Sequence, residues 1–308
     1  MNVIVTGGTS FIGLAVIRKL LESGHEVWAA VRPGSANKDK LPSHERLHTF
    51  SCSLEEVGDL PFTQEGKRLA ARKDKAFLHM AWDGVGSAGR SDKNIQEQNI
   101  RNSIKAAEAA QALGCGRFLF SGSQAEYGVH REVMTEDAPC APVSEYGKAK
   151  LEFGKRAEEL CRKSGMEYVH CRIFSVYGPG DHPWSLVNSC IRTFEEGGCM
   201  KLGECTQKWN FLYIDDAAEA IAALLTSEKA ISGIYNIAGN DTRVLREFIE
   251  EIYEICGRKG SFVYGTRGFN AEGPASLIPD ISRVEKAAGW EPAVSFREGI
   301  ERTRRVLI

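Results

Sequence analysis

Tyr146 and Lys150 place a phenol and an ammonium group four residues apart in one segment of the chain. Side chains at this spacing lie on the same face of an α-helix. That face continues with the apolar residues Phe153, Ala157, Leu160 and Cys161. We therefore expect an amphipathic helix that buries both polar groups, where the lysine charge favours the phenolate and prepares a proton donor. The simpler alternative for this loose pattern is a core tyrosine beside a lysine that reaches solvent.

The amino terminus has the order strand, glycine-rich turn and helix. An apolar run at Val3–Val5 leads into the turn at residues 6–13, and a helical pattern follows as far as Leu21. Glycines let the backbone approach a diphosphate, which free amide groups and the dipole of a helix start then hold. The residues expected to contact a dinucleotide here are Gly7, Thr9, Ser10, Phe11, Ile12 and Gly13. Ser10 stands where a glycine is usual, so we expect the phosphates slightly farther from the backbone; a plain strand-to-helix turn is the alternative.

The end of the next predicted strand, Glu26–Val31, distinguishes the two nicotinamide dinucleotides. An acidic side chain at this place accepts hydrogen bonds from the adenosine ribose hydroxyls of NAD. The sequence has no acid there, and Arg32 and Ser35 instead offer a guanidinium and a hydroxyl group to a 2′-phosphate. We therefore expect NADP as the cofactor. NAD remains the alternative, because a solvated surface arginine would give the same sequence.

Composition describes a chain of 308 residues with a formal net charge of -2, long enough to bury a large core. The near-neutral charge disfavours nucleic acid or a membrane surface as a partner. Neither a signal peptide nor an apolar run of membrane-spanning length is present, so we expect a cytoplasmic protein. The nine cysteines show no C-x-x-C pair, and even the closest group, Cys190, Cys199 and Cys205, lacks a fourth ligand. We predict no metal site.

Strand-like and helix-like segments alternate along the chain. Beyond the first two strands, the pattern predicts strands at 47–51, 76–80, 117–121, 168–174 and 233–237, with helices around 95–113 and Tyr146. This order is typical of an α/β fold with a doubly wound parallel Rossmann sheet. Changes in glycine, proline and charge content predict a smaller, interleaved C-terminal α/β substrate domain. We expect the dinucleotide-binding domain at 1–175 plus 210–239, and the substrate domain at 176–209 plus 240–308.

Several motifs together resemble the extended short-chain dehydrogenases/reductases, also called the NAD(P)-dependent epimerase/dehydratase family. The resemblance spans the chain and rests on the order of VTGGTSFIG, FLHMAW, FLFSGSQAEYG, YGKAK, CRIFSVYGPGD, NFLYIDDAAEAI and GWEPAVSFREGI. It implies a Rossmann domain, a small substrate domain and a substrate that is usually a nucleotide-activated sugar. It also implies a homodimer that pairs the helices around 95–113 and 146–161.

The family's catalytic set maps onto Ser123, Tyr146 and Lys150. By this resemblance Lys150 holds the nicotinamide ribose and lowers the pKa of Tyr146, Ser123 bonds the oxygen of the reacting carbon, and Tyr146 moves the proton. Further cofactor contacts are implied at Met80, Ala81, Trp82, Asn99 and Phe174, and substrate contacts at Ser123, Gln124, Ser175 and Trp209.

Departures from the family pattern narrow the reaction. Sugar 4,6-dehydratases carry an Asp-Glu pair after the catalytic hydroxyl, where this chain has Gln124 and Ala125. Epimerase-reductases that invert carbons beside a ketone carry a cysteine directly after the catalytic hydroxyl and a histidine farther on. This chain has Gln124 in place of the cysteine, although His182 lies in a plausible loop for the histidine. Carbonyl reduction and 4-epimerisation through a transient ketone remain. NADP character favours net reduction, and the resemblance implies a nucleotide-linked keto-deoxysugar as the substrate. A non-enzymatic dinucleotide-binding regulator is a further alternative.

The substrate's diphosphate lacks its usual partner in this sequence. The family's Arg-Asp pair is replaced by Trp209 and Asn210, so we expect Trp209 to stack on a base or sugar, or to pack as an ordinary aromatic. Arg267 or Arg283 is the candidate for the missing phosphate contact. Three other polar residues, Asp83, Glu126 and His130, are expected to be solvated loop residues.

Overall fold

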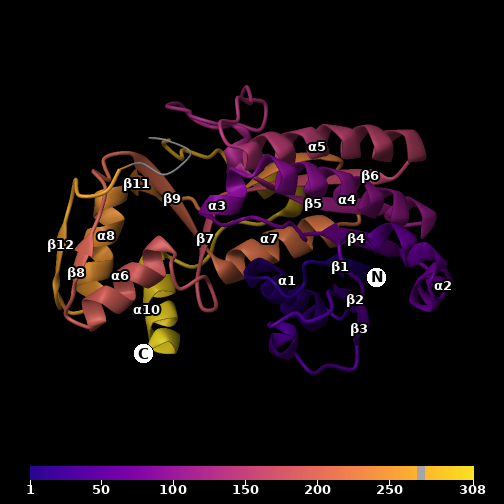
Figure 1. Cartoon of the computed structure of the whole chain (residues 1–308), viewed down its shortest axis with the longest axis horizontal. Helices are drawn as coiled ribbons and strands as arrows, with labels where there is room; N and C mark the ends of the chain where they lie inside the picture. Colours follow the sequence, from indigo (N-terminus) through magenta and orange to yellow (C-terminus); the bar gives the residue numbers. More distant parts are fainter. Residues whose placement is uncertain (269–274) are drawn as a thin grey trace.

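A seven-stranded parallel sheet forms the centre of the computed structural model, which describes residues 1–268 and 275–308 (Figure 1). Its order is β10-β6-β5-β4-β1-β2-β3. The strands are β1 (Asn2–Thr6), β2 (Glu26–Val31), β3 (Leu47–Ser51), β4 (Lys75–His79), β5 (Arg117–Ser123), β6 (Glu167–Ile173) and β10 (Gly233–Ile237). The chain leaves β1 toward β2 and later returns to β4 on the other side, so the strand order reverses at β1. Such a reversal opens a crevice at the carboxyl ends of the strands.

Helices cover both faces of this sheet (Figure 1). On one face α1 (Phe11–Glu22) and α7 (Ile214–Thr226) pack on Val3 and Val5, and on the other α4 (Lys93–Ala112) and α5 (Glu145–Ser164) share a core with Ile4. Alternate residues of β1 therefore serve opposite cores, as the two-residue period of a strand requires. The predicted doubly wound α/β fold is confirmed.

Two small sheets and further helices lie to one side of the seven-stranded sheet, on the left in Figure 1. The sheets have the orders β11-β9-β7 and β12-β8. Their strands are β7 (Ser175–Tyr177), β8 (Cys199–Lys201), β9 (Lys208–Tyr213), β11 (Thr242–Val244) and β12 (Ser261–Val263). The helices beside them are α6 (Leu186–Glu195), α8 (Leu245–Ile255) and α10 (Phe296–Leu307), and these elements share a third core.

Short helices complete the chain. They are α2 (Gln64–Ala70), α3 (Ser87–Arg90) and α9 (Ser282–Ala288), with 3-10 turns η1 (Lys38–Lys40), η2 (Val57–Phe62) and η3 (Gln124–Glu126). The domain division at 1–175 plus 210–239 and 176–209 plus 240–308 remains a proposal, since β9 crosses its boundary at residue 210. Within the described parts of the chain, no helix has the length and hydrophobicity needed to cross a membrane.

Asn210 joins β9 to the turn that follows β10. Its side chain is fully buried, its Oδ1 accepts a hydrogen bond from the Gly239 N–H at 2.8 Å, and its Nδ2 donates to the Gly239 carbonyl at 2.8 Å. The same Nδ2 donates to the Asp241 carbonyl and the Thr242 hydroxyl at 3.2 and 3.0 Å. The residue that departs from the family pattern here is thus a structural one.

Asn210→Ala removes these bonds and leaves buried backbone groups without partners. We expect the free energy of unfolding to fall by about 2–4 kcal/mol, measured by urea denaturation. Lys208→Ala, at an exposed position of the same strand, is the control and should change stability by less than about 0.5 kcal/mol. Equal stability of the two variants would contradict the assignment.

Candidate active site

A cleft of about 510 Å³ opens where the strand order of the large sheet reverses. Its wall combines residues from the glycine turn, the ends of β4, β5 and β6, the start of α5 and the third core. The predicted site residues that line it are Ser10, Phe11, Ile12, Met80, Trp82, Ser123, Gln124, Tyr146, Lys150, Phe174, Ser175 and Trp209. Residues far apart in the sequence thus meet in one space that reaches from the glycine turn to Tyr146 and Lys150.

The turn at one end of the cleft depends on two glycines. Gly7 has a φ of +76°, and a Cβ there would collide with the backbone of Ala81. A Cβ at Gly13 would overlap the Gly7 carbonyl oxygen. The Oγ of Ser10 caps α1 by accepting a hydrogen bond from the Gly13 N–H at 3.1 Å. Ser10 therefore uses one amide of the first helical turn, and the N–H groups of Phe11 and Ile12 have no acceptor within the helix.

Tyr146 lies in the first turn of α5, beside the end of β5. Ser144 caps this helix by accepting from the Gly147 N–H at 3.1 Å, and Gly147 leaves no room for a Cβ against the Ala125 carbonyl. These contacts hold the helix start against η3 and bring the Tyr146 side chain within hydrogen-bonding reach of the Ser123 hydroxyl. The phenol and the serine hydroxyl therefore face the cleft as a pair.

Lys150 is buried one turn farther along α5. Its Nζ donates to the Ser121 carbonyl at 2.7 Å and lies 3.9 Å from the ring centroid of Trp82 and 4.7 Å from that of Phe120. The Trp82 indole is held in turn by a 2.8 Å bond from its Nε1 to Gln96. Desolvation lowers the pKa of Lys150 to about 7.

The predicted effect of Lys150 on Tyr146 is not what the structure shows. Burial raises the pKa of Tyr146 above its ordinary value, and the opposing influences are the charge of Arg90 and the bond with Ser123. The Arg90 guanidinium lies 4.1 Å from the Tyr146 ring centroid, whereas the Lys150 Nζ lies 5.6 Å from it and is bonded to a carbonyl. The prediction of a lysine-acidified phenol is therefore corrected: the cation beside Tyr146 comes from α3.

Residues 3–238 match the sequence model of the NAD dependent epimerase/dehydratase family. The chain belongs to this family. The uncharacterised UDP-glucose epimerase YtcB of Bacillus subtilis is 26% identical over 97% of this chain and 96% of that protein. Because the family is NAD dependent and its members similar to this chain are nucleotide-sugar epimerases and dehydratases, the chain is an NAD(P)-dependent enzyme, as predicted.

Solved structures agree with this assignment at the level of the fold. The UDP-glucose 4-epimerase of Thermotoga maritima, solved with UDP-glucose, has a TM-score of 0.85 and 24% identity, with 99% of this chain and 98% of that chain covered. The UDP-glucuronic acid 4-epimerase of Bacillus cereus, solved with UDP-glucuronic acid and NAD, also has a TM-score of 0.85 and 24% identity, over 100% and 99% of the chains.

Arg32 and Ser35, the residues predicted to select the dinucleotide, do not line the cleft of this epimerase/dehydratase family member. Arg32 is 68% exposed, and its Nη1 lies 3.6 Å from the Asp83 carboxylate. The Ser35 hydroxyl donates to the Thr9 hydroxyl at 3.3 Å. Asn99 is buried and bonds both the N–H and the carbonyl of Asp83, at 3.0 and 2.9 Å. Asn99 therefore fixes the loop that carries the partner of Arg32.

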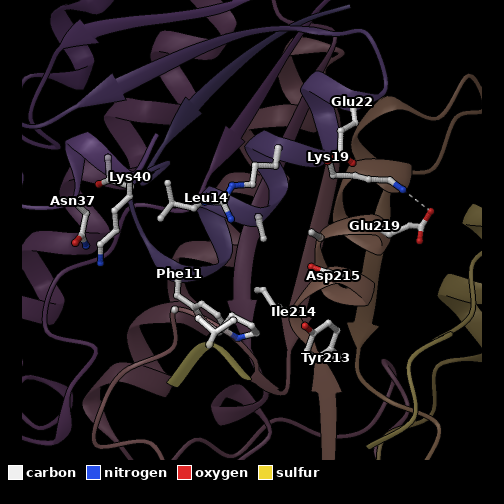
Figure 2. Close-up of a pocket in the computed structure, with 17 residues that line it drawn as sticks. Phe11, Leu14, Lys19, Glu22, Asn37, Lys40, Tyr213, Ile214, Asp215 and Glu219 are labelled. Atoms are coloured by element: carbon white, nitrogen blue, oxygen red, sulfur yellow. Dashed lines mark hydrogen bonds and ion pairs between the residues drawn. The ribbon is translucent and has the colours of Figure 1, made fainter. Parts of the chain in front are cut away.

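A second cavity, of about 760 Å³, lies beside α1 and α7 (Figure 2). Thr9, Phe11, Asn37 and Lys40 contribute to its wall, and a 2.8 Å ion pair between Lys19 and Glu219 crosses one side of it. None of Ser123, Tyr146 and Lys150 lines it. The larger cavity is thus separate from the reacting groups, although Phe11 lines both spaces.

The two arginines proposed for the substrate's phosphate do not line the cleft. Arg283 pairs with Asp137 at 2.6 Å and with Glu136 at 3.5 Å, and Arg267 is an exposed residue outside the cleft wall. Arg90 supplies the guanidinium group that lines the cleft in the described part of the chain. Sequence reasoning missed it because α3 is a single helical turn without a periodic pattern.

Glu126 was expected to be a solvated loop residue, and this prediction is wrong. The side chain is 0% exposed and bonds His170 and Arg172, each at 3.0 Å. A signal was present in the sequence, because His170 and Arg172 stand two residues apart and point to the same face of a predicted buried strand. Two basic residues on one buried face require a buried acid as their partner.

Lys150→Met tests the burial of the lysine. The pKa of Lys150 is about 7 in the folded protein and ordinarily 10.5, so between these values the unfolded chain binds the additional proton and stability rises with pH. The methionine variant lacks this dependence. We expect it to be more stable than the unmodified protein at pH 7, with the difference shrinking toward pH 10.

Thermal unfolding at several pH values measures this difference. Lys148→Met, which changes an exposed lysine of the same helix, should show no comparable trend. A stability difference for Lys150→Met that stays constant from pH 7 to 10.5 would mean that the Lys150 ammonium is not desolvated.

Proposed function

We propose that the chain is a nucleotide-sugar 4-epimerase in which Tyr146 exchanges a proton with the hydroxyl group of the reacting carbon. The observation that carries this proposal is the Ser123–Tyr146 hydroxyl pair in a cleft that begins at the glycine turn. The next residues, Gln124 and Ala125, provide no second acid and base for the elimination of water. Relatives of this chain include a UDP-glucose 4-epimerase, which supports the same reaction.

The residues of the cleft have separate tasks in this reaction. Ser123 would donate a hydrogen bond to the sugar oxygen, and Tyr146 would take the proton from that oxygen and later return it. Arg90 is the cation whose charge opposes the cost of forming the Tyr146 phenolate. A bound nicotinamide would supply hydride transfer at the reacting carbon. Trp82, Phe174 and the glycine turn would hold the dinucleotide along the cleft.

For the dinucleotide we infer NADP, with NAD as the alternative. The support is the missing acid at the end of β2 and the presence of Arg32 and Ser35 beside Thr9. A 2′-phosphate would take the place of Asp83 as the partner of Arg32, and both of these side chains are exposed enough to rearrange. Guanidinium pairs with phosphate are charge-assisted and bidentate, so a single arginine gives measurable selectivity.

Net reduction of a nucleotide-linked keto sugar is the second candidate, and Arg32 is the observation that favours it, because NADP is suited to reduction. The two reactions differ in their use of the cofactor. An epimerase interconverts two nucleotide sugars without net change in NADPH absorbance at 340 nm, whereas a reductase consumes one NADPH for each product. Purified protein incubated with UDP- and dTDP-linked sugars therefore decides between them.

The substrate and the assembly state complete the proposal. Gln124, Ser175 and Trp209 line the cleft and are proposed substrate contacts, with a nucleotide sugar as the substrate class. The buried Nε1 of Trp209 has no hydrogen-bond partner within the described residues. A homodimer through α4 and α5 is also proposed, and the mass of the protein in solution tests it.

Tyr146→Phe removes the proton donor and leaves the ring in place. We expect turnover to fall by about 100-fold or more, because the reaction loses its acid and base, while dinucleotide affinity is retained. Steady-state kinetics and a fluorescence titration with NADPH measure the two quantities. Tyr235→Phe is the control, since it deletes a buried hydroxyl that bonds Ile231 away from the cleft. Undiminished turnover in Tyr146→Phe would exclude this mechanism.

Arg32→Ala should weaken NADPH binding by about 1–3 kcal/mol and leave NADH binding nearly unchanged, because only NADPH carries the 2′-phosphate. Both affinities are measured by isothermal titration calorimetry. Arg258→Ala is the matched control, since Arg258 is an exposed arginine paired with Glu254 in a distant helix. Tighter binding of NADH than of NADPH to the unmodified protein would show that Arg32 does not select NADP.

A further inference from the structure

Glu126 lies at the end of η3 with every described contact directed into the protein. Its Oε1 accepts from the Ser123 N–H at 2.8 Å and from His170 Nε2 at 3.0 Å, and its Oε2 accepts from Arg172 Nε at 3.0 Å. The Ser123 Oγ in turn accepts from the Ala125 N–H at 3.2 Å, so Ser123 and Glu126 form a reciprocal capping box. The carboxylate thus binds the backbone of the serine proposed to act on the substrate.

The protein carries Glu126 as a carboxylate. Burial alone would raise the pKa of Glu126. The interactions with His170, the charge of Arg172 and the hydrogen bond from the Ser123 N–H outweigh burial and hold the pKa of this carboxyl below its ordinary value. A carboxylate only accepts, so His170 donates from Nε2, and its Nδ1 lies 3.2 Å from the Tyr168 hydroxyl oxygen. The negative charge is therefore fixed at one place.

The surroundings are shaped for this group. A Cβ at Gly122 would overlap both His170 Nε2 and Glu126 Oε1, and a Cβ at Gly154 would overlap the His170 ring. Arg172 also donates from Nη1 to the Glu136 carbonyl at 3.1 Å, which ties the group to the loop before α5. Gly122 and Gly154 have no side chain, and this allows the Glu126 carboxylate and the His170 imidazole to approach the end of β5.

Charged groups converge on Lys150 from several elements. Glu126 on η3 raises the pKa of Lys150, Arg90 on α3 lowers it, and desolvation has a larger effect than either. His79 on β4 is also close, and burial together with the Lys150 charge lowers the pKa of His79 to about 3, so it is neutral near pH 7. Tyr146 on the same helix is a neutral phenol. Of these groups, Glu126 is the one whose charge raises the pKa of Lys150.

We propose that Glu126 is a positioning residue for the reaction: it fixes the Ser123 hydroxyl opposite Tyr146. This inference rests on the proposed roles of Ser123, Tyr146 and Lys150. The geometry carries it, because one carboxylate bonds the serine backbone and two cationic or donor side chains in a space that glycines leave open.

Glu126→Gln removes the charge and keeps the shape. We expect kcat to fall about 10-fold or more, with the KM for the sugar nucleotide changed less than about 3-fold, since the substrate is not touched. Loss of the anion should also move the alkaline limb of the kcat/KM profile to lower pH by about half a unit or more, because Lys150 then loses its proton more readily. The ratio of unmodified to variant activity should therefore grow from pH 6 to pH 8.

Glu126→Asp separates the two effects. The charge remains but the shorter side chain cannot reach both the Ser123 N–H and Arg172, so kcat should fall while the alkaline limb stays in place. Glu136→Gln is the matched control: Glu136 is 6% exposed and accepts from the Asn236 N–H at 3.0 Å, but it does not bond Ser123. It should lower the melting temperature and leave the pH profile unchanged.

A further variant covers the case in which Glu126→Gln does not fold. Glu126→Leu combined with Arg172→Met replaces the whole ion pair with apolar side chains, which restores stability in comparable buried pairs. It should fold and still show low kcat. Full activity of this double variant, or of Glu126→Gln with an unshifted pH profile, would overturn the inference. If Tyr146→Phe keeps its activity, the proposed function itself has failed instead.

Discussion

Desolvation of the Lys150 ammonium is the constraint on which the rest of the site depends. A buried amine needs an acceptor and a polarisable surface, and here the Ser121 carbonyl and the rings of Trp82 and Phe120 provide them. Each partner has its own support: Ser121 belongs to the fully buried strand β5, and Gln96 holds the Trp82 indole. Burial lowers the pKa of Lys150 to about 7, so nearby charges can change the fraction of the lysine that is protonated near neutral pH.

The charged groups near Lys150 and Tyr146 lie on two sides of the cleft. Arg90 approaches Tyr146 from α3, and Glu126 with Arg172 lies behind Ser123 at the end of β5. Tyr146 stands between a cation that favours its phenolate and a fixed anion that disfavours it, and burial raises its pKa further. The phenol therefore keeps its proton near neutral pH, and in the proposed reaction it would exchange that proton with the reacting oxygen.

The sequence predicted the parts of this arrangement that depend on local pattern. The bounds of β2, β3 and β10 agree with the predicted strands. Of these, β2 is a buried and nearly continuous apolar run between turns, whereas β3 is a partly exposed strand at the edge of the sheet. The three-residue strands β7 and β11 were not predicted, since so few residues show no period. Glu126 was misjudged because its partners lie 44 and 46 residues farther along the chain. The burial of Tyr146 was predicted, but its pKa was misjudged because desolvation outweighs the nearby charges and because no sequence pattern pointed to Arg90.

Trp209 and Asn210, which stand at the positions of the family's Arg-Asp pair, differ in their relation to the cleft. Asn210 is fully buried, and its described bonds go to the segment at 239–242, so its difference from the family pattern reflects how β9 is anchored. Trp209 lines the cleft, at the position where the family pattern has an arginine. The guanidinium of the cleft comes instead from α3, on the wall beside Tyr146. In the proposed reaction a nucleotide sugar would therefore meet a guanidinium group on the wall formed by α3 and an aromatic ring on the wall formed by β9.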